Sequence, residues 1–309
     1  MLHTDHIRID PVYRDALRAC GLDRVESVLA RTAGRVAAWS RTTDTLYVAR
    51  GGDDPGFYVK RYYYAGWNKR LRGTFRGTFF GEHRGQAEFY LLREMRSLGL
   101  PAVRPVAFGA RRLGHFVGAC FLITEEAPDA LNLTTFARDV MIGRETLSPT
   151  LRVAIVRQFA RQVARIHATG FAHGQLFWRN VLIRFGPTGD PEFLFLDVRP
   201  RRGGRHIGRP SQWWITELGH LAASALPFTT RSERLLFLTE YFGARKLTHP
   251  LKRYIREIDR LAKRWSGHER QRIKMNDLFA VWNRQLEMEK VHSARSADEL
   301  ATPLPGARS

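Results

Sequence analysis

The sequence predicts an α+β protein of two lobes, the first rich in β-strands and the second mostly helical. Up to about residue 124, runs of β-branched and aromatic residues alternate with Gly/Pro turns, which is typical of strands. From Leu131 onward, apolar residues recur mostly at helical spacing. The change of pattern near 127–131 marks the boundary between the lobes. The predicted units are a lead-in helix within residues 1–29, a first lobe at 30–128, a second lobe at 129–292 and a disordered tail at 293–309.

In the first lobe we predict a short polar helix, five strands and one longer helix. The polar helix covers about residues 11–20. The longer helix, at about 86–98, carries apolar residues on one face and ends at Gly99 and Pro101. The strands follow from their β-branched and aromatic content. They are predicted at 35–40, 45–49, 57–62, 103–108 and 116–124.

The second lobe is predicted to contain a β-hairpin between helices. Two apolar runs, 181–185 and 192–196, flank a Gly/Pro turn and form the hairpin. The helices follow from apolar residues at a period of 3.6. They are predicted at about 151–168, 215–225, 231–241, 250–266 and 276–290.

The composition is that of a globular protein with a large excess of positive charge. Its net charge is +20, and only seven of the 50 cationic residues are Lys. Because Arg binds phosphate groups through two parallel hydrogen bonds, the charge favours nucleic acid, anionic lipid or a phosphorylated substrate, although a solvated basic surface would look the same. Two cysteines do not suggest a disulfide framework, which favours a reducing compartment. The polar N-terminus is not a signal peptide, and the longest apolar stretch, Leu218–Phe228, is too short to span a bilayer.

The segment between His173 and Asp197 has the spacing of a phosphoryl-transfer site. In kinase-type enzymes, a loop His-x-Asp-(four residues)-Asn precedes a hairpin that ends on a second Asp. The first Asp accepts the proton of the attacking hydroxyl, and the Asn and the second Asp hold Mg²⁺. Here His173, Asn180 and Asp197 are in register, and we expect the histidine to organise the loop rather than to react. Gln175 occupies the base position, and a carboxamide cannot take a proton.

Two further segments predict the site of a nucleotide. Lys60 lies on the predicted strand 57–62, and Glu88 lies on the helix that follows. An ion pair between them would hold the lysine on the α- and β-phosphates of ATP. The apolar strand that ends at Thr124 opens into Glu125 and Glu126, where a hinge would offer backbone groups to an adenine.

These segments, in this order, resemble the Kdo/WaaP lipopolysaccharide-core kinase family, which has a bilobal protein-kinase-like fold. The resemblance covers about residues 30 to 245. The segments that carry it are Tyr58–Arg61, Ala87–Pro101, Pro105–Gly109, Ile123–Glu126, His173–Leu182, Asp197–Arg199 and Trp214–Leu221.

The resemblance implies a function and a place in the cell. Lys60 and Glu88 would anchor ATP, and Asn180 and Asp197 would bind Mg²⁺. The acceptor would be a sugar hydroxyl of the lipid-linked inner core, phosphorylated by a cytoplasmic protein at the inner face of the inner membrane. Glu217 stands where the family usually has an Asp that braces the catalytic loop, and no Gly-rich phosphate loop is recognisable.

Gln175 leaves more than one function open. General base catalysis is typically worth about 10² to 10⁴-fold, while metals and cations supply most of the stabilisation in phosphoryl transfer, so the protein could be a slow kinase. A nucleotide-binding pseudokinase with a regulatory or scaffold role would keep the same residues. A nucleic-acid-binding protein would explain the charge, but no helix-turn-helix, zinc or RNA-recognition signature is present, so we expect no nucleic acid.

Two basic segments are candidates for contact with substrate or membrane. The segment 67–79 has an aromatic or leucine every fourth residue with arginines between, which suits a helix on an anionic membrane or a loop packed on the first lobe. The other segment follows Asp197 and would suit the phosphates of a lipid-linked sugar, or be solvated. The candidate contact residues are Arg70, Arg72 and Arg76 in the first segment and Arg201 and Arg205 in the second. Nothing in the sequence indicates an oligomeric state.

Overall fold

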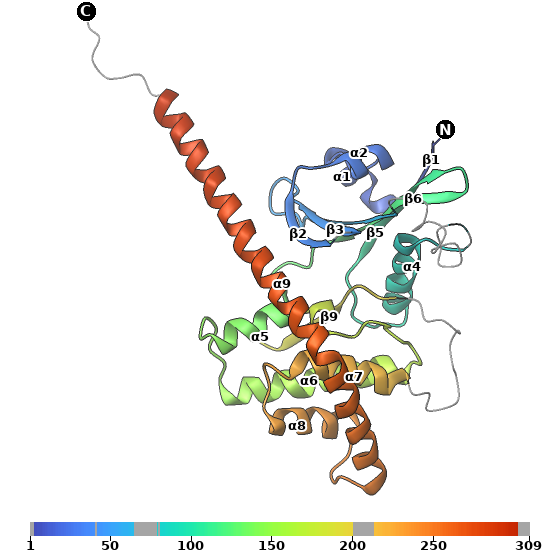
Figure 1. Cartoon of the computed structure of the whole chain (residues 1–309), viewed down its shortest axis with the longest axis vertical. Helices are drawn as coiled ribbons and strands as arrows, with labels where there is room; N and C mark the ends of the chain where they lie inside the picture. The colour runs from blue at the N-terminus through green and yellow to red at the C-terminus, as the bar shows by residue number, and fades with distance from the viewer. Residues whose placement is uncertain (1–2, 41, 65–78, 80, 200–212, 302–309) are drawn as a thin grey trace, which may run out of the picture. The chain divides into compact units, whose positions relative to one another are not determined.

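The computed structural model describes residues 3–40, 42–64, 79, 81–199 and 213–301, with only the backbone for 276–301. A β-rich part is followed by a helical part, as predicted (Figure 1). The chain divides into two compact units, Met1–Glu269 and Arg270–Ser309, and the first unit contains both lobes.

The first lobe is built on a six-stranded antiparallel sheet with the strand order β1-β5-β6-β4-β3-β2. The strands are β1 (His3–Ile9), β2 (Arg35–Ser40), β3 (Thr43–Val48), β4 (Phe57–Tyr63), β5 (Pro105–Leu113) and β6 (Phe116–Glu125). Strand β4 lies inside the sheet, between β3 and β6. Because side chains alternate along a strand, Lys60 and Tyr62 lie on one face of the sheet, and Val59 and Arg61 lie on the other.

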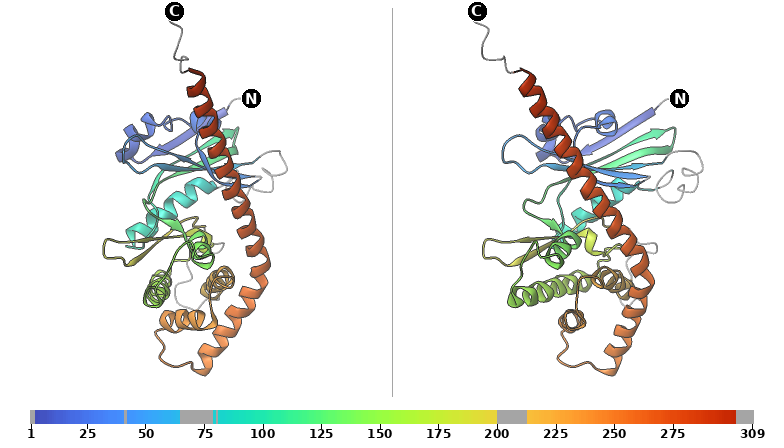
Figure 2. Two further views of the ribbon diagram at one scale, coloured as in Figure 1. Left: turned by 90° about the vertical axis from the view of Figure 1, so that its left-hand side faces the viewer. Right: turned by 60° about the vertical axis from the view of Figure 1, so that its left-hand side comes forward.

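Helices lie on both faces of this sheet (Figures 1 and 2). The short helices α1 (Arg14–Ala19) and α2 (Val25–Ala30) pack on one face, where Leu17 and Val28 join Phe57 and Ile123 in an apolar cluster. Arg61 holds the end of α2 to the sheet, because its guanidinium donates to backbone carbonyls of that segment and pairs with an aspartate of β3.

Helix α4 (Arg84–Ser97) packs on the opposite face, and a glycine lets it approach closely. A Cβ atom at Gly85 would lie 2.2 Å from the carbonyl oxygen of Phe121, so no side chain fits there. His83 caps the helix by accepting a hydrogen bond from the backbone N–H of Gln86. The first turn of α4 is therefore held against β6. Glu88 follows one turn later, and α4 lies over the face of the sheet that carries Lys60.

Strand β1 was not predicted. Only a polar segment was predicted before the helix at 11–20, whereas residues 3–9 pair with β5 along their whole length. A 3-10 turn (Pro11–Tyr13) and α1 then occupy the predicted helical segment. Most β1 side chains are exposed and only Ile7 and Ile9 pack on the apolar cluster, so this edge strand lacks the apolar alternation that identifies a half-buried strand. Residues 3–30 therefore belong to the first lobe.

The second lobe consists of helices around a small three-stranded sheet. The helices are α5 (Leu133–Met141), α6 (Pro149–Ala168), α7 (Trp213–Ala225), α8 (Arg231–Tyr241) and α9 (His249–Ala301), and the strands are β7 (Leu131–Asn132), β8 (Val181–Phe185) and β9 (Pro191–Phe195). Helix α8 begins with a capping box between Thr230 and Glu233. One apolar cluster joins Phe89 of α4 to Phe195 of β9 and Phe159 of α6, so the two lobes share a core.

Helix α9 replaces the two C-terminal helices that the sequence predicts at 250–266 and 276–290. Gly267 lies in the gap between the two predicted helices, but an isolated glycine costs a helix only about 1 kcal/mol relative to alanine, and no glycine or proline follows until after residue 301. Residues 293–301 of the predicted tail belong to this helix. Residues 302–309 lie outside the described part of the chain.

Candidate active site

Lys60, Glu88 and Asp197 come from three different elements and meet in one cluster. The Lys60 ammonium lies 3.1 Å from each carboxylate oxygen of Glu88, on α4. It lies 2.8 Å from Oδ1 of Asp197, which follows β9 in the second lobe. The structure therefore brings together the predicted nucleotide anchor and one of the two predicted metal ligands, although 137 residues separate Lys60 from Asp197 in the chain.

The electrostatics of the cluster keep Lys60 and Asp197 charged. Burial alone would lower the pKa of Lys60, but the carboxylates of Asp197 and Glu88 raise it well above its ordinary value. Burial opposes ionisation of Asp197, yet Lys60 and Arg199 lower the pKa of its carboxyl to about 2. Burial raises the pKa of Glu88, and the neighbouring ammonium opposes this effect. At neutral pH, Lys60 is a cation beside an ionised Asp197.

Tyr62 belongs to the same cluster, although it was not among the predicted site residues. Its hydroxyl donates a 2.6 Å hydrogen bond to Oε2 of Glu88, and the side chain is buried. Burial and the nearby Glu88 carboxylate raise the pKa of this phenol well above its ordinary value, so it remains a donor. The sequence does place Tyr62 near Lys60, because the residue two places further along a strand lies on the same face of the sheet.

The predicted catalytic loop is folded tightly around Asn180. The Asn180 side-chain Nδ2 donates to the carbonyl oxygen of Gln175 at 2.8 Å, and the backbone N–H of Gln175 donates to Nδ1 of His173 at 3.3 Å. The backbone N–H of Leu196 donates to the Asn180 carbonyl at 3.1 Å. These bonds place Asn180 beside the end of β9, next to Asp197, and fix the backbone of Gln175.

Two backbone conformations in this region are unusual. Gly174 has φ +80°, and a Cβ atom there would lie 2.4 Å from the carbonyl oxygen of Arg199, so only glycine fits. Asp197 has φ +56°, which is uncommon for a residue with a side chain. For a residue with a side chain, such as Asp197, this conformation costs roughly 1 to 3 kcal/mol, and such strain concentrates at functional sites. Gly174 lies on the loop and Asp197 on the segment after β9, so the two residues lie on the two sides of the contact between these segments.

Glu217 of α7 braces the start of the loop through hydrogen bonds to its backbone. Its carboxylate accepts hydrogen bonds from the backbone N–H groups of His173 and Gly174, and Oε2 lies 3.1 Å from Nε2 of His167. The other ring nitrogen of His167 lies 2.7 Å from the Tyr241 hydroxyl. Burial opposes ionisation of Glu217, but the hydrogen bond with His167 brings its pKa below the ordinary value. Burial lowers the pKa of His173, so this histidine is neutral at neutral pH.

Glu125 and Glu126 hold the end of β6, and their N–H groups are bonded within the protein. The backbone N–H of Glu126 donates to the carbonyl of Gly56, and that of Glu125 donates to the carbonyl of Arg104. The Glu126 carboxylate also accepts from the N–H of Gly56 and the hydroxyl of Tyr47, each at 2.8 Å. Neither N–H is therefore available to an adenine. Any hinge contact would have to use another backbone group.

The five predicted contact arginines, Arg70, Arg72, Arg76, Arg201 and Arg205, lie outside the described residues. Phe79, at the end of the basic aromatic segment, packs against Phe116 with 4.7 Å between ring centroids. Among the residues that the structure describes, no helix is both long and apolar enough to cross a bilayer.

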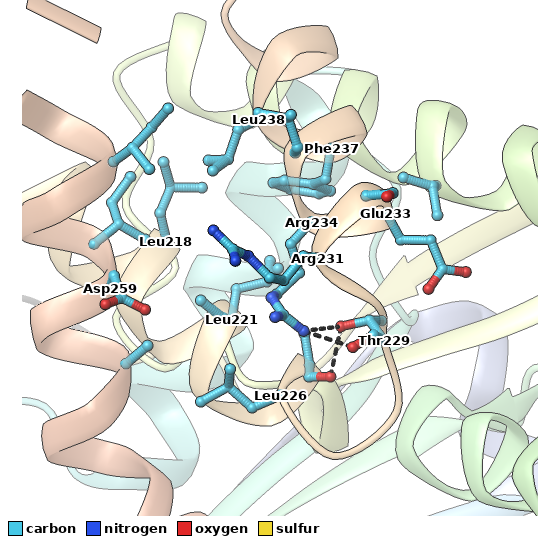
Figure 3. Close-up of a pocket in the computed structure, with 18 of the residues that line it drawn as sticks. Leu218, Leu221, Leu226, Thr229, Arg231, Glu233, Arg234, Phe237, Leu238 and Asp259 are labelled. Carbon is cyan, nitrogen blue, oxygen red and sulfur yellow. Dashed lines mark hydrogen bonds between the residues drawn. The ribbon is translucent and has the colours of Figure 1, made fainter. Parts of the chain in front are cut away.

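An apolar cavity of about 860 Å³ lies in the second lobe and was not predicted (Figure 3). Residues of α6, α7, α8 and α9 line it, among them Leu218, Leu221, Phe237 and Leu238. The lining also includes four cationic residues, Arg231, Arg234, Arg256 and Lys263. None of the lining residues belongs to the Lys60–Asp197 cluster, so the cavity is a separate site.

The fold and this cluster define the class of protein: a protein-kinase-like phosphotransferase. The model of the lipopolysaccharide kinase (Kdo/WaaP) family matches residues 26–241, and the chain belongs to this family. The predicted family and the predicted bilobal kinase-like fold are thereby confirmed.

Curated relatives are sugar kinases. The chain is 26% identical over 210 residues to the lipopolysaccharide core heptose(I) kinase WaaP of Pseudomonas aeruginosa, covering 66% of this chain and 74% of that protein. It is 28% identical over 160 residues to the 3-deoxy-D-manno-octulosonic acid kinase of Vibrio vulnificus strain YJ016, covering 50% and 58%. It is 22% identical to WaaP of Escherichia coli K12, covering 50% and 59%. The chain thus spans under two thirds of the Vibrio and Escherichia proteins.

A solved structure of WaaP in complex with acyl carrier protein has the same fold. It superimposes with a TM-score of 0.59 at 22% identity, covering 84% of this chain and 98% of that one.

Proposed function

We propose that this protein is an ATP- and Mg²⁺-dependent kinase that phosphorylates a sugar hydroxyl of a lipopolysaccharide core. The observation that carries the proposal is the Lys60 ammonium between Glu88 and Asp197, with Asn180 alongside. A lysine held by a helix carboxylate is the arrangement that kinases use to bind phosphates. The substrate class is supported by the relatives, which are named for core heptose and 3-deoxy-D-manno-octulosonic acid.

The residues present fit a magnesium ion. Mg²⁺ prefers oxygen ligands and is usually held by one or two protein groups together with substrate phosphates. Asp197 is ionised, and the hydrogen bond from Asn180 Nδ2 to Gln175 leaves the carboxamide oxygen for a metal. Asp197 and Asn180 would hold the ion, which when bound neutralises charge on the triphosphate. Lys60 binds phosphate oxygens, and Glu88 and Tyr62 keep it in place.

Gln175 sets the rate rather than the type of reaction. In a loose phosphoryl-transfer transition state, little proton transfer is needed before the acceptor oxygen begins to bond to phosphorus. The carboxamide of Gln175 orients the acceptor hydroxyl by a hydrogen bond, and the proton leaves to phosphate or solvent. The missing base makes the enzyme slow, by up to the 10² to 10⁴-fold that a positioned base typically supplies.

The alternative is a nucleotide-binding pseudokinase, and Gln175 is the observation that favours it. Both functions require ATP to bind. Adding ATP with Mg²⁺ should therefore raise the melting temperature by several degrees, since a ligand at about a hundred times its Kd stabilises a protein by roughly 2.7 kcal/mol. ATP with a chelator should give a smaller shift. No shift at millimolar ATP would exclude both readings. A shift without phosphate transfer to any core acceptor would leave the pseudokinase.

We also propose that the apolar cavity binds an acyl chain presented by an acyl carrier protein. A neighbour of the same fold was solved with this partner. The leucine and phenylalanine lining suits a hydrocarbon chain, and the cationic residues suit an anionic linker or partner surface.

The acyl group itself provides the test of this partner. Burial of each CH₂ is worth about 0.8 kcal/mol, so carrier protein loaded with a long acyl chain should bind at least tenfold more tightly than the unacylated form. Isothermal titration of the two forms against the whole chain measures this difference. Equal affinity for both, or binding to neither, would contradict the proposal.

A further inference from the structure

A buried carboxylate of α9, Glu269, is attached to the turn of the loop that carries Asn180. Glu269 is 1% exposed, although it is a charged residue on a long helix. Its Oε2 forms an ion pair with Nη1 of Arg179, the residue that immediately precedes Asn180. Its Oε1 accepts a 3.2 Å hydrogen bond from the hydroxyl of Ser224 on α7.

The same attachment extends to the rest of the turn that carries Asn180. The Ser224 hydroxyl oxygen accepts a 3.3 Å hydrogen bond from the backbone N–H of Trp178. The Arg179 guanidinium lies 4.0 Å from the centre of the Phe177 ring. That ring stacks on His220 at 4.4 Å between centroids.

Helix α9 contributes a second contact at this place. Trp265, one turn before Glu269, lies edge-on to the rings of both Phe177 and His220, at 6.3 and 5.0 Å between centroids. The carbonyl of Arg179 is bonded as well, since it accepts from the side chain of Asn132. Each of the three residues before Asn180 is thus fixed by a side chain from outside the loop.

A buried ion pair contributes little net stability to a fold. Removing two charges from water costs several kcal/mol per ion, and well-packed apolar residues of similar size often give an equal or more stable protein. What a charged pair adds is a defined geometry. Residues that contact a metal ligand without touching the metal typically change metal affinity by about 10 to 100-fold when they are lost.

We propose that Glu269 is a positioning residue for the metal ligand Asn180, and that α9 acts on the catalytic loop through Arg179 and Ser224. This inference rests on the proposed function, in which Asn180 binds Mg²⁺. The carboxylate holds the turn Trp178–Asn180 in the orientation that presents the Asn180 carboxamide oxygen to the ion.

The direct test measures the Mg²⁺ concentration that gives half-maximal stabilisation by ATP, in wild type and in Glu269→Gln. The variant keeps the shape of the side chain but loses its charge, and the concentration should rise at least tenfold. At saturating Mg²⁺ the maximal shift should be close to wild type. Glu240→Gln is the matched control, because that carboxylate pairs with Arg161 and Arg157 on α6 and contacts no residue of the loop in the described structure. It should leave the Mg²⁺ dependence unchanged.

A second variant separates positioning from stability. In the double substitution Arg179→Met with Glu269→Met, an apolar contact replaces the ion pair, so the melting temperature should remain near that of wild type. The Mg²⁺ requirement should still rise. A wild-type Mg²⁺ requirement in this double variant, or in a folded Glu269→Gln, would overturn the inference.

A third readout needs neither nucleotide nor metal. Hydrogen exchange of a peptide that covers 174–182 should be faster in Glu269→Gln than in wild type, because Arg179 loses its ion pair and the Ser224 hydroxyl, which accepts from the Trp178 amide, loses the carboxylate that fixes it. Unchanged exchange in that peptide would also overturn the inference. Failure of wild type to bind ATP with Mg²⁺ would instead count against the proposed function, and this exchange measurement would still decide whether Glu269 holds the loop.

Discussion

Replacing Gln175 by Asp is expected to raise the rate of phosphate transfer by about 10² to 10⁴-fold, the contribution of a positioned general base. The backbone of residue 175 is already held, because its N–H donates to His173 and its carbonyl accepts from Asn180. The new side chain would therefore start from the position at which kinases place their base. The rate is measured with label from the γ-phosphate of ATP and a core oligosaccharide lacking phosphate.

Gln175→Asn is the matched control, since it shortens the side chain in the same way but supplies no base. Its rate should not exceed that of wild type. If Gln175→Asp gives no gain while ATP still binds, the acceptor site is lost and the pseudokinase reading holds. A lower rate in Gln175→Asp than in wild type would show that the orienting hydrogen bond of the amide contributes more to the rate than a base at this position would.

The second large effect is expected at Asp197. Asp197→Asn keeps the size of the side chain but removes a charge whose pKa of about 2 keeps it ionised. Lys60 would lose its 2.8 Å partner, and a metal would lose its anionic ligand. If the metal supplies several kcal/mol to the transition state, the rate should fall by at least about 10³-fold.

Asp190→Asn provides the comparison for this prediction. Asp190 lies in the exposed turn between β8 and β9, on the same hairpin, where its carboxylate accepts from the Thr188 hydroxyl. Surface substitutions usually change stability by less than 0.5 kcal/mol, so Asp190→Asn should remain folded. Its rate of phosphate transfer should therefore stay within a factor of about two of wild type. An Asp197→Asn protein with near wild-type activity would show that Asp197 does not bind the metal.

Those parts of the fold that depend on local pattern were predictable from the sequence. The helix predicted at 231–241 has these bounds in the structure, because Thr230 and Glu233 form a capping box that a sequence reveals. The hairpin over 181–196 was marked by two apolar runs around a Gly/Pro turn. The loop spacing from His173 to Asp197 predicted which residues meet, because the motif has a fixed geometry in this class of fold.

What the sequence could not show are contacts between distant elements that follow no motif. Glu269 lies between the two C-terminal helices that the sequence predicts, and its burial depends on where the continuous helix α9 packs. The cavity in the second lobe arises in the same way, since its lining comes from α6, α7, α8 and α9, whose packing against one another no local pattern predicts. The N–H groups of Glu125 and Glu126 are occupied by strand and turn partners that no local rule identifies.

Transfer of label from γ-labelled ATP to a phosphate-free lipopolysaccharide core decides whether this protein is a sugar kinase. With wild-type protein and Mg²⁺, we expect slow but measurable transfer to a sugar hydroxyl. The product should be stable to alkali as a phosphate monoester and should not form when the metal is chelated. Stoichiometric binding of ATP with no label on any core acceptor, in wild type and in Gln175→Asp alike, would contradict the account.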